Sequence, residues 1–174
     1  SRPRAELLRE LTSMAQVIAV AGAHGKTTTS SMVAHALLGA GMAPGYLIGG
    51  ALTTTGEHAD WGAGEWLVVE ADESDRSMLA LDVDVAVVTN VELDHHATYG
   101  SLEEVRAVFR AFLHGAPTAI LWDRPDVVAL RDAADGETVP FDVPDPDLGP
   151  DGVSFDWRGH RVALSVPGAH NARN

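Results

Sequence analysis

The segment 22–29 combines glycines, one lysine and threonines in an order that suits phosphate binding. It follows an apolar run at 17–21 and opens a stretch with a helical pattern. Glycines let the backbone curl so that several N–H groups point at one place, and a helix N-terminus adds partial positive charge there. Lys26 supplies a full charge, and the Thr27 hydroxyl can ligate Mg²⁺. The segment therefore predicts a nucleotide triphosphate site.

Lys26 is the only lysine in the chain, and the other eleven basic residues are arginines. The motif departs from the usual P-loop pattern, which has glycine where Val20 stands. A tight strand-to-helix turn with a surface lysine is the alternative interpretation. The strand–loop–helix setting and the solitary lysine favour the phosphate site.

The segment 70–75 carries four carboxylates in six residues, directly after a second apolar run. Carboxylates this close repel one another unless cations intervene, and Mg²⁺ prefers oxygen ligands. Glu70, at the end of the predicted strand, is the best candidate ligand. The alternative is a solvated acidic loop that caps a helix near Arg76, and this interpretation accounts for Ser74 or Asp75.

The segment 90–96 follows a third apolar run and contains Asn90, Asp94 and two adjacent histidines. A neutral imidazole can ligate a metal, and Asp94 can orient it. Two adjacent histidines do not easily face the same site, so we select His95. Taken alone, the segment is more typical of a polar loop, but its position beside the other two motifs favours a metal site.

Apolar runs alternate with helical patterns along the chain. The runs 17–21, 66–69, 83–89 and 119–122 are typical of strands buried on both faces, and helical patterns cover 4–15, 26–40, 125–133 and a segment that opens at Ser101. This alternation predicts an α/β fold of the P-loop NTPase type, with a mostly parallel sheet that carries helices on both faces.

Ligands of such sheets bind at the carboxyl ends of the strands. Lys26, Glu70, Asn90 and His95 each follow a predicted strand, so we expect them at one edge of the sheet. Ser101 and Glu104 form a capping-box pattern at a helix start. The remaining predictions are loops at 51–64 and 142–152, a small C-terminal β-hairpin at 153–166, and a turn with a possible helix start at 167–174.

Composition limits the class of protein. A length of 174 residues suits one domain with a sizeable core. The formal net charge of −13 argues against bulk binding to nucleic acid or to an anionic membrane. No apolar run reaches the roughly 18 residues of a membrane span, and the charged first residues show no secretory pattern, so we expect a cytoplasmic protein. The lack of cysteine excludes disulfides and thiolate metal sites.

Together the motifs resemble the Mur ligases, the ATP-dependent enzymes that build the peptide stem of peptidoglycan. Segment 21–29 looks like their phosphate loop, 90–95 with Tyr99 also fits, and 167–174 looks like their nucleotide-contacting segment. His24 points to the alanine-adding branch or to the related peptide-recycling ligase. Segment 70–79 resembles the alanine-adding branch more closely. The resemblance covers nearly the whole chain.

The resemblance implies that ATP phosphorylates the lactyl carboxylate of UDP-N-acetylmuramate and that the amine of L-alanine attacks the acyl phosphate. It implies catalytic roles for Lys26, Glu70 and His95, with one Mg²⁺ on Thr27 and Glu70 and a second on Glu70 and His95. The expected nucleotide-binding residues are Gly22, His24, Gly25, Lys26, Thr27, Thr28, Asn90, His170, Asn171 and Asn174.

The resemblance further implies that residues 1–174 are a central ATP-binding domain without the N-terminal UDP-binding domain and the C-terminal domain of the family. We therefore expect the chain to fold, to bind nucleotide weakly and not to ligate by itself.

Three alternatives stay open. The first is the ligase that reattaches recycled peptide to the same UDP-sugar. The second is a GTPase-type binding module, but its Asn-Lys-x-Asp-like base reader is excluded because Lys26 is the only lysine. The third is a metal-binding module without a nucleotide role, which rests on the acidic segment and His95 alone.

Overall fold

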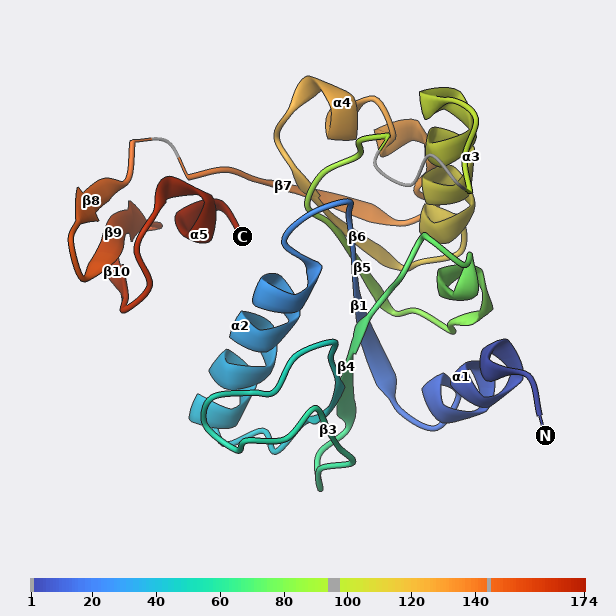
Figure 1. Ribbon diagram of the computed structural model, residues 1–174, viewed down its shortest axis with the longest axis horizontal. Coiled ribbons are helices and arrows are strands. Elements are labelled where there is room, and N and C mark those ends of the chain that lie inside the picture. The colour runs from blue at the N-terminus through green and yellow to red at the C-terminus, as the bar shows by residue number, and fades with distance from the viewer. Residues whose placement is uncertain (1, 94–97, 144) are drawn as a thin grey trace. The chain divides into compact units, whose positions relative to one another are not determined.

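The computed structural model describes residues 2–93, 98–143 and 145–174, which divide into two units, Ser1–Pro140 and Phe141–Asn174 (Figure 1). The first unit holds the larger sheet. Its elements are α1 (Arg4–Thr12), β1 (Gln16–Ala21), α2 (Lys26–Gly39), β2 (Gly45–Leu47), β3 (Ala59–Asp60), β4 (Trp66–Glu70), the 3₁₀ helix η1 (Ser77–Ala80), β5 (Val85–Val88), α3 (Leu102–Leu113), β6 (Thr118–Trp122), α4 (Pro125–Val128), the 3₁₀ helix η2 (Arg131–Ala133) and β7 (Glu137–Phe141).

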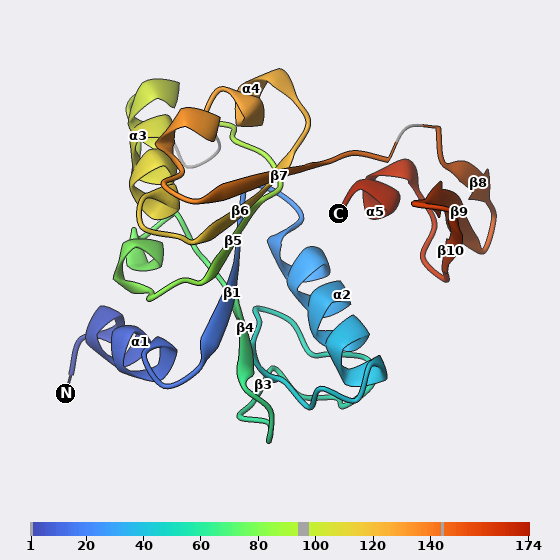
Figure 2. The ribbon, with the colours of Figure 1, turned by 180° about the vertical axis from the view of Figure 1, so that it is seen from behind.

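The strand order of this seven-stranded sheet is β3-β2-β4-β1-β5-β6-β7. The strands β2, β4, β1, β5 and β6 are paired in parallel, and the short edge strand β3 is antiparallel to β2. From β1 the chain adds β2, β3 and β4 on one side before it returns to add β5 on the other. Figure 2 shows β4, β1, β5 and β6 in this order. The sheet therefore has its topological switch point at β1, where α/β proteins bind ligands.

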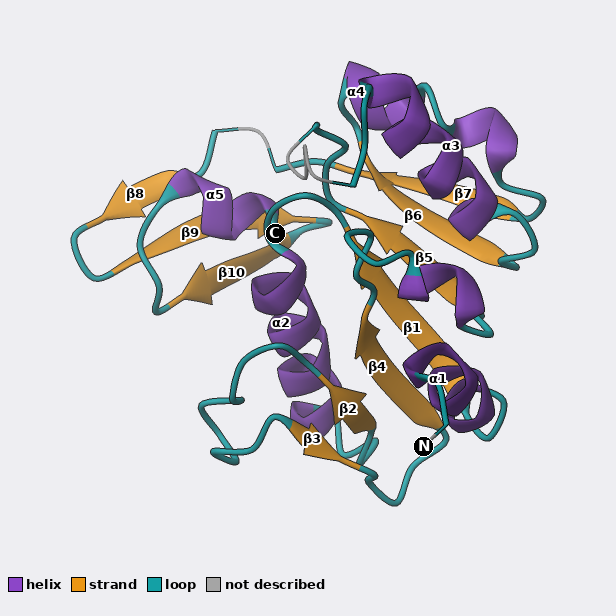
Figure 3. Cartoon of the chain, turned by 45° about the vertical axis from the view of Figure 1, so that its right-hand side comes forward, coloured by secondary structure: helices purple, strands orange, loops and turns teal. Residues whose placement is uncertain are grey.

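Helices cover both faces of the sheet, as the sequence predicted. In Figure 3, α2 lies on one side of the strands, and α1 and α3 lie on the other. Alternate side chains of β1 (Val17, Ala19 and Ala21) belong to the same buried cluster as Phe109 of α3. The opposite face has its own cluster, in which Ala34 of α2 joins Tyr46 of β2 and Val68 of β4. None of the helices in the described ranges is long and apolar enough to cross a membrane.

The second unit is a small antiparallel sheet with one short helix. It contains β8 (Asp147–Gly149), β9 (Gly152–Trp157), β10 (His160–Leu164) and α5 (Ala169–Arg173), in the sheet order β10-β9-β8. The predicted hairpin is confirmed. Its turn places Arg158 and Gly159 at φ values of 48° and 81°, and antiparallel pairing of β9 with β10 follows.

The sequence prediction was wrong in several short elements. The predicted loop 51–64 contains β3, and the predicted loop 142–152 contains β8. No strand was predicted at β7, which contains Pro140, a residue that is unusual inside a strand. The predicted helix 125–133 is divided into α4 and η2. At the division the Leu130 N–H donates to Val127 O at 2.9 Å, an i→i+3 bond that keeps both buried side chains on one face.

The N-terminus of α3 has the predicted side-chain cap in slightly different form. The Ser101 hydroxyl accepts a hydrogen bond from the Glu104 N–H at 3.3 Å, whereas the Glu104 carboxylate accepts from the N–H of Gly100, not of Ser101. We expect Ser101→Ala to lower the free energy of unfolding by about 1 kcal/mol, measured by urea denaturation, because a helix N–H loses its acceptor. Ser101→Asp keeps an acceptor and should retain the stability. An equal loss in both variants would contradict the assignment.

Candidate functional site

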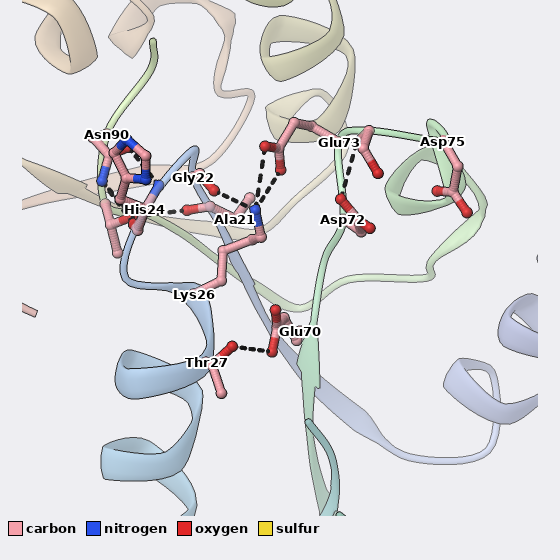
Figure 4. Close-up of polar contacts among 12 residues, drawn as sticks. Ala21, Gly22, His24, Lys26, Thr27, Glu70, Asp72, Glu73, Asp75 and Asn90 are labelled. Carbon is pink, nitrogen blue, oxygen red and sulfur yellow. Dashed lines mark hydrogen bonds and ion pairs between the residues drawn. The ribbon is translucent and has the colours of Figure 1, made fainter. Parts of the chain in front are cut away.

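Three loops meet at the carboxyl end of β1. This strand lies between β4 and β5, and the parallel registers pair Val20 with Glu70 and Ala21 with Val88. The loop before α2, the acidic segment after β4 and the residues after β5 therefore leave the sheet at the same edge (Figure 4). The sheet order brings Lys26, Glu70 and Asn90 together although more than 60 residues separate the first from the last.

Two glycines shape the loop between β1 and α2. Gly22 has a φ of 149°, and a Cβ atom there would clash with the Thr89 hydroxyl. Gly25 caps α2 in the left-handed conformation, with a φ of 84°, and offers no side-chain acceptor to the first N–H groups of the helix. These N–H groups and the helix dipole favour an anion at this end of α2.

Asn90 holds the loop between β1 and α2 through hydrogen bonds to the backbone of that loop. Its side-chain oxygen accepts from the His24 N–H at 2.9 Å, and its side-chain nitrogen donates to the His24 carbonyl at 2.7 Å. The Thr89 hydroxyl donates to the same carbonyl at 2.8 Å. Asn90 is buried, whereas the His24 side chain is exposed and lies 3.8 Å from the Glu92 carboxylate. Asn90 and His24, both predicted to bind nucleotide, thus have a structural connection to each other.

Thr27 and Glu70 place two oxygen ligands side by side. The Thr27 hydroxyl donates to Glu70 Oε2 at 2.9 Å, and the Gly49 N–H donates to the same oxygen at 2.8 Å. Such a pair suits Mg²⁺, which often takes one or two protein oxygens and completes its shell with phosphates and water. Within the described ranges, no three His, Cys, Asp or Glu side chains gather closely enough to hold a metal by themselves.

Lys26 forms a nearly buried ion pair that the sequence did not predict. Its ammonium group donates to Gly22 O at 2.7 Å and to the two carboxylate oxygens of Glu73 at 2.9 and 3.2 Å. Only 12% of the Lys26 side chain and 3% of the Glu73 side chain are exposed. The sequence of segment 70–75 offers four carboxylates and gives no reason to select Glu73 among them. The solitary lysine nevertheless indicates that one of these carboxylates is its partner.

Tyr99 fixes the backbone of Glu73. The Tyr99 side chain is buried, and its hydroxyl donates to the Glu73 carbonyl. The Arg76 guanidinium lies over the Tyr99 ring at 5.6 Å from the centroid. Burial raises the pKa of the Tyr99 phenol, so the hydroxyl remains a donor.

The other acidic residues of the segment stabilise its turns. Asp72 accepts from the Ser74 N–H at 3.0 Å, and Asp75 accepts from the Ser77 N–H at 2.8 Å at the start of η1. Burial raises the pKa of Asp75, but hydrogen bonds from Ser77 and the charge of Arg4 outweigh it and hold the pKa below its usual value. Of the two residues expected to cap a helix near Arg76, Ser74 and Asp75, Asp75 accepts a hydrogen bond from the first residue of η1, whereas the N-cap position itself is Arg76.

A cavity of about 370 Å³ adjoins Glu70, on the side where α1 packs. Its walls come from α1, the end of β2 and the end of β4: Arg4, Leu7, Leu8, Leu47, Ile48, Gly49, Glu70 and Asp72. Glu70 therefore contacts both Thr27 at the start of α2 and a space large enough for part of a second ligand.

Five predicted residues remain: Thr28 of α2, His95, His170, Asn171 and Asn174. His95, with Asp94 and His96, is outside the described residues, and its metal role stays a prediction. His170 and Asn171 belong to α5 of the second unit, and Asn174 follows this helix. There the Asn171 side-chain amide donates to the Pro167 carbonyl at 2.7 Å.

Comparison with known proteins identifies relatives along nearly the whole chain. The family model of the Mur ligase middle domain matches residues 20–174. A UDP-N-acetylmuramate–L-alanine ligase of Verminephrobacter eiseniae is 42% identical over an aligned length of 195 residues. The alignment covers 99% of this chain and 40% of that protein. A protein of the same name from Streptomyces griseus is 41% identical and is matched over 98% of this chain and 41% of its own length. The chain thus spans about two fifths of the length of these relatives.

Solved structures agree with this fold. The UDP-N-acetylmuramate:L-alanyl-γ-D-glutamyl-meso-diaminopimelate ligase of Neisseria meningitides superposes with a TM-score of 0.82 at 26% identity, over 97% of this chain and 61% of that one. MurF of Acinetobacter baumannii superposes with a TM-score of 0.73 at 20% identity, over 97% of this chain and 42% of that one, which shows a likeness of fold. Because the family model covers most of its length, the chain belongs to the Mur ligase middle domain family.

Proposed function

We propose that this chain is the ATP-binding part of an enzyme that joins L-alanine to UDP-N-acetylmuramate through an acyl phosphate. The single observation that carries the proposal is the arrangement of Lys26, Thr27 and Glu70 around the N-terminus of α2, at the switch point of the sheet. The names of the relatives at about 40% identity supply the substrates.

Each residue has a separate task in this proposal. Backbone N–H groups of the loop and the Lys26 ammonium bind the β- and γ-phosphates, as phosphoryl transfer depends mainly on positioning and charge neutralisation. Thr27 and Glu70 hold Mg²⁺, which when bound neutralises charge on the phosphates. Gly49 and Asn90 act indirectly, because Gly49 fixes the Glu70 carboxylate and Asn90 fixes the loop.

The acid substrate is assigned to the cavity beside Glu70. The Glu70 carboxylate forms one wall of the cavity and also contacts Thr27. A substrate carboxylate bound in the cavity therefore lies near the transferred phosphate. His95 is assigned, together with Glu70, as a ligand of a second Mg²⁺. His170, Asn171 and Asn174 are assigned to nucleotide or substrate contacts, and flanking domains of a longer cytoplasmic protein complete the site.

The peptide-recycling ligase is the second candidate, favoured by the TM-score of 0.82 with the Neisseria enzyme. The test is an assay of the full-length protein with ATP, UDP-N-acetylmuramate and either L-alanine or the tripeptide L-alanyl-γ-D-glutamyl-meso-diaminopimelate. We expect ADP release that depends on L-alanine. Release with the tripeptide alone would replace the first proposal by the second, and release with neither would reject both.

A further inference from the structure

The Lys26 ammonium group has its donors engaged within the protein. It has three N–H groups, and three acceptor oxygens lie within 3.2 Å: Gly22 O and both carboxylate oxygens of Glu73. With 12% of its side chain exposed, Lys26 has little access to water that could replace these acceptors. A phosphate that approaches Lys26 therefore meets an ammonium group that already has a counter-ion.

Glu73 is held firmly in this position. Its side chain is 3% exposed, and its carbonyl accepts from the buried Tyr99 hydroxyl and from the Arg76 N–H. A carboxylate this deeply buried requires a cation, because an uncompensated buried charge is strongly destabilising. In Figure 4 the Glu73 carboxylate points at Lys26 across the mouth of the loop.

The neighbouring acidic side chains do not share this contact. Asp72 and Asp75 accept from backbone N–H groups of their own segment, and Glu70 is bound to Thr27 and Gly49. Among residues 70–75, Glu73 is the one that forms an ion pair with Lys26. The pairing is therefore a specific feature of Glu73 and not a general effect of the acidic segment.

We propose that Glu73 is a positioning residue of the nucleotide site, an internal counter-ion that holds Lys26 at the mouth of the loop and competes with phosphate for it. The inference rests on the proposed phosphate-binding role of Lys26. A nucleotide with a β-phosphate must share or displace Glu73, and it then lies beside a buried negative charge. Glu73 therefore weakens the affinity for ADP and ATP but not for AMP, whose phosphate does not reach Lys26.

Calorimetric titration of the chain with ADP and with AMP, in the presence of Mg²⁺, tests this inference. Glu73→Gln retains an acceptor for Lys26 but removes the competing charge, so we expect ADP to bind on the order of tenfold more tightly, as like charges at short range repel strongly. Glu73→Asp keeps the charge on a shorter side chain and should give an intermediate affinity. AMP affinity should stay unchanged in both variants.

Asp75→Asn is the matched control, since it removes one negative charge from the same segment and retains the acceptor for Ser77. Its ADP affinity should equal that of the wild type. Unchanged or weaker ADP binding by folded Glu73→Gln would overturn the inference, and if that variant does not fold, unchanged binding by Glu73→Asp would do the same. Failure of the wild type to bind ADP at all would instead reject the proposed function.

In the full-length enzyme, Glu73→Gln should lower the KM for ATP and leave the KM for L-alanine unchanged.

Discussion

Replacing Lys26 by alanine is expected to weaken the binding of ADP and ATP by at least about 100-fold, because each charge-assisted hydrogen bond to phosphate contributes roughly 1.5–3 kcal/mol. Lys26 is the only lysine of the chain, and its ammonium lies at the mouth of the loop before α2. Calorimetric titration with each nucleotide in the presence of Mg²⁺ measures the effect. Unchanged affinity in a folded variant would leave Lys26 as an ordinary turn residue.

The Lys26→Ala variant also removes the ion pair that Lys26 forms with the buried Glu73 carboxylate. Breaking a buried ion pair by removing one partner is destabilising by roughly 3–5 kcal/mol. The double variant Lys26→Met with Glu73→Gln removes both charges and keeps similar side-chain volumes. It should therefore have a higher melting temperature than Lys26→Ala. It should still fail to bind ADP. A metal-binding module without a nucleotide role predicts a different result, in which the wild type binds no nucleotide and metal affinity is equal in all variants.

Replacing Glu70 by glutamine is expected to lower the activity of the full-length enzyme by at least about 100-fold, since the charge stabilisation by a bound metal ion is worth several kcal/mol. Glutamine still accepts hydrogen bonds from Thr27 and Gly49, so the fold should be retained. The diagnostic measurement is the Mg²⁺ dependence of nucleotide affinity. Wild-type affinity should rise with Mg²⁺, whereas the affinity of the variant should respond weakly.

Glu65→Gln is the control for the loss of one negative charge. Glu65 is exposed and directly precedes β4, at the end of the strand opposite to Glu70. Its replacement should change neither the activity nor the response to Mg²⁺. If both variants responded to Mg²⁺ like the wild type, Glu70 would have no role as a metal ligand.

The sequence was sufficient to predict where the polar motifs lie in the fold. Each of three motifs follows a short apolar run, and the structure has β1, β4 and β5 at these runs, paired in parallel as neighbours. Apolar runs predict buried strands well because both faces of the sheet are covered. The edge strands β3 and β7 escaped prediction because they are short or contain proline, and pairing with a neighbour defines them more than their own residues do.

Contacts between motifs could not be predicted from their spacing. The choice of Glu73 as the partner of Lys26 depends on how the chain turns after β4, which Tyr99 stabilises from a segment more than 20 residues away. Likewise, the spacing gave no reason to expect the two hydrogen bonds between the Asn90 side chain and the backbone of His24. Sequence patterns identify residue types suited to chemistry, but the three-dimensional arrangement decides which of them act directly.

The two hydrogen bonds between the Asn90 side chain and the His24 backbone have a consequence for the thermodynamics of ligand recognition. One bond involves the backbone N–H of His24 and the other its carbonyl, as in the pairing of two strands, and together they fix the loop to the end of β5 before a ligand binds. The loop therefore loses its conformational entropy when the protein folds, and little of this entropy remains to be lost on association. A weak ligand affinity in this chain would then reflect competing charges or missing contacts, and not the entropy cost of ordering a flexible loop.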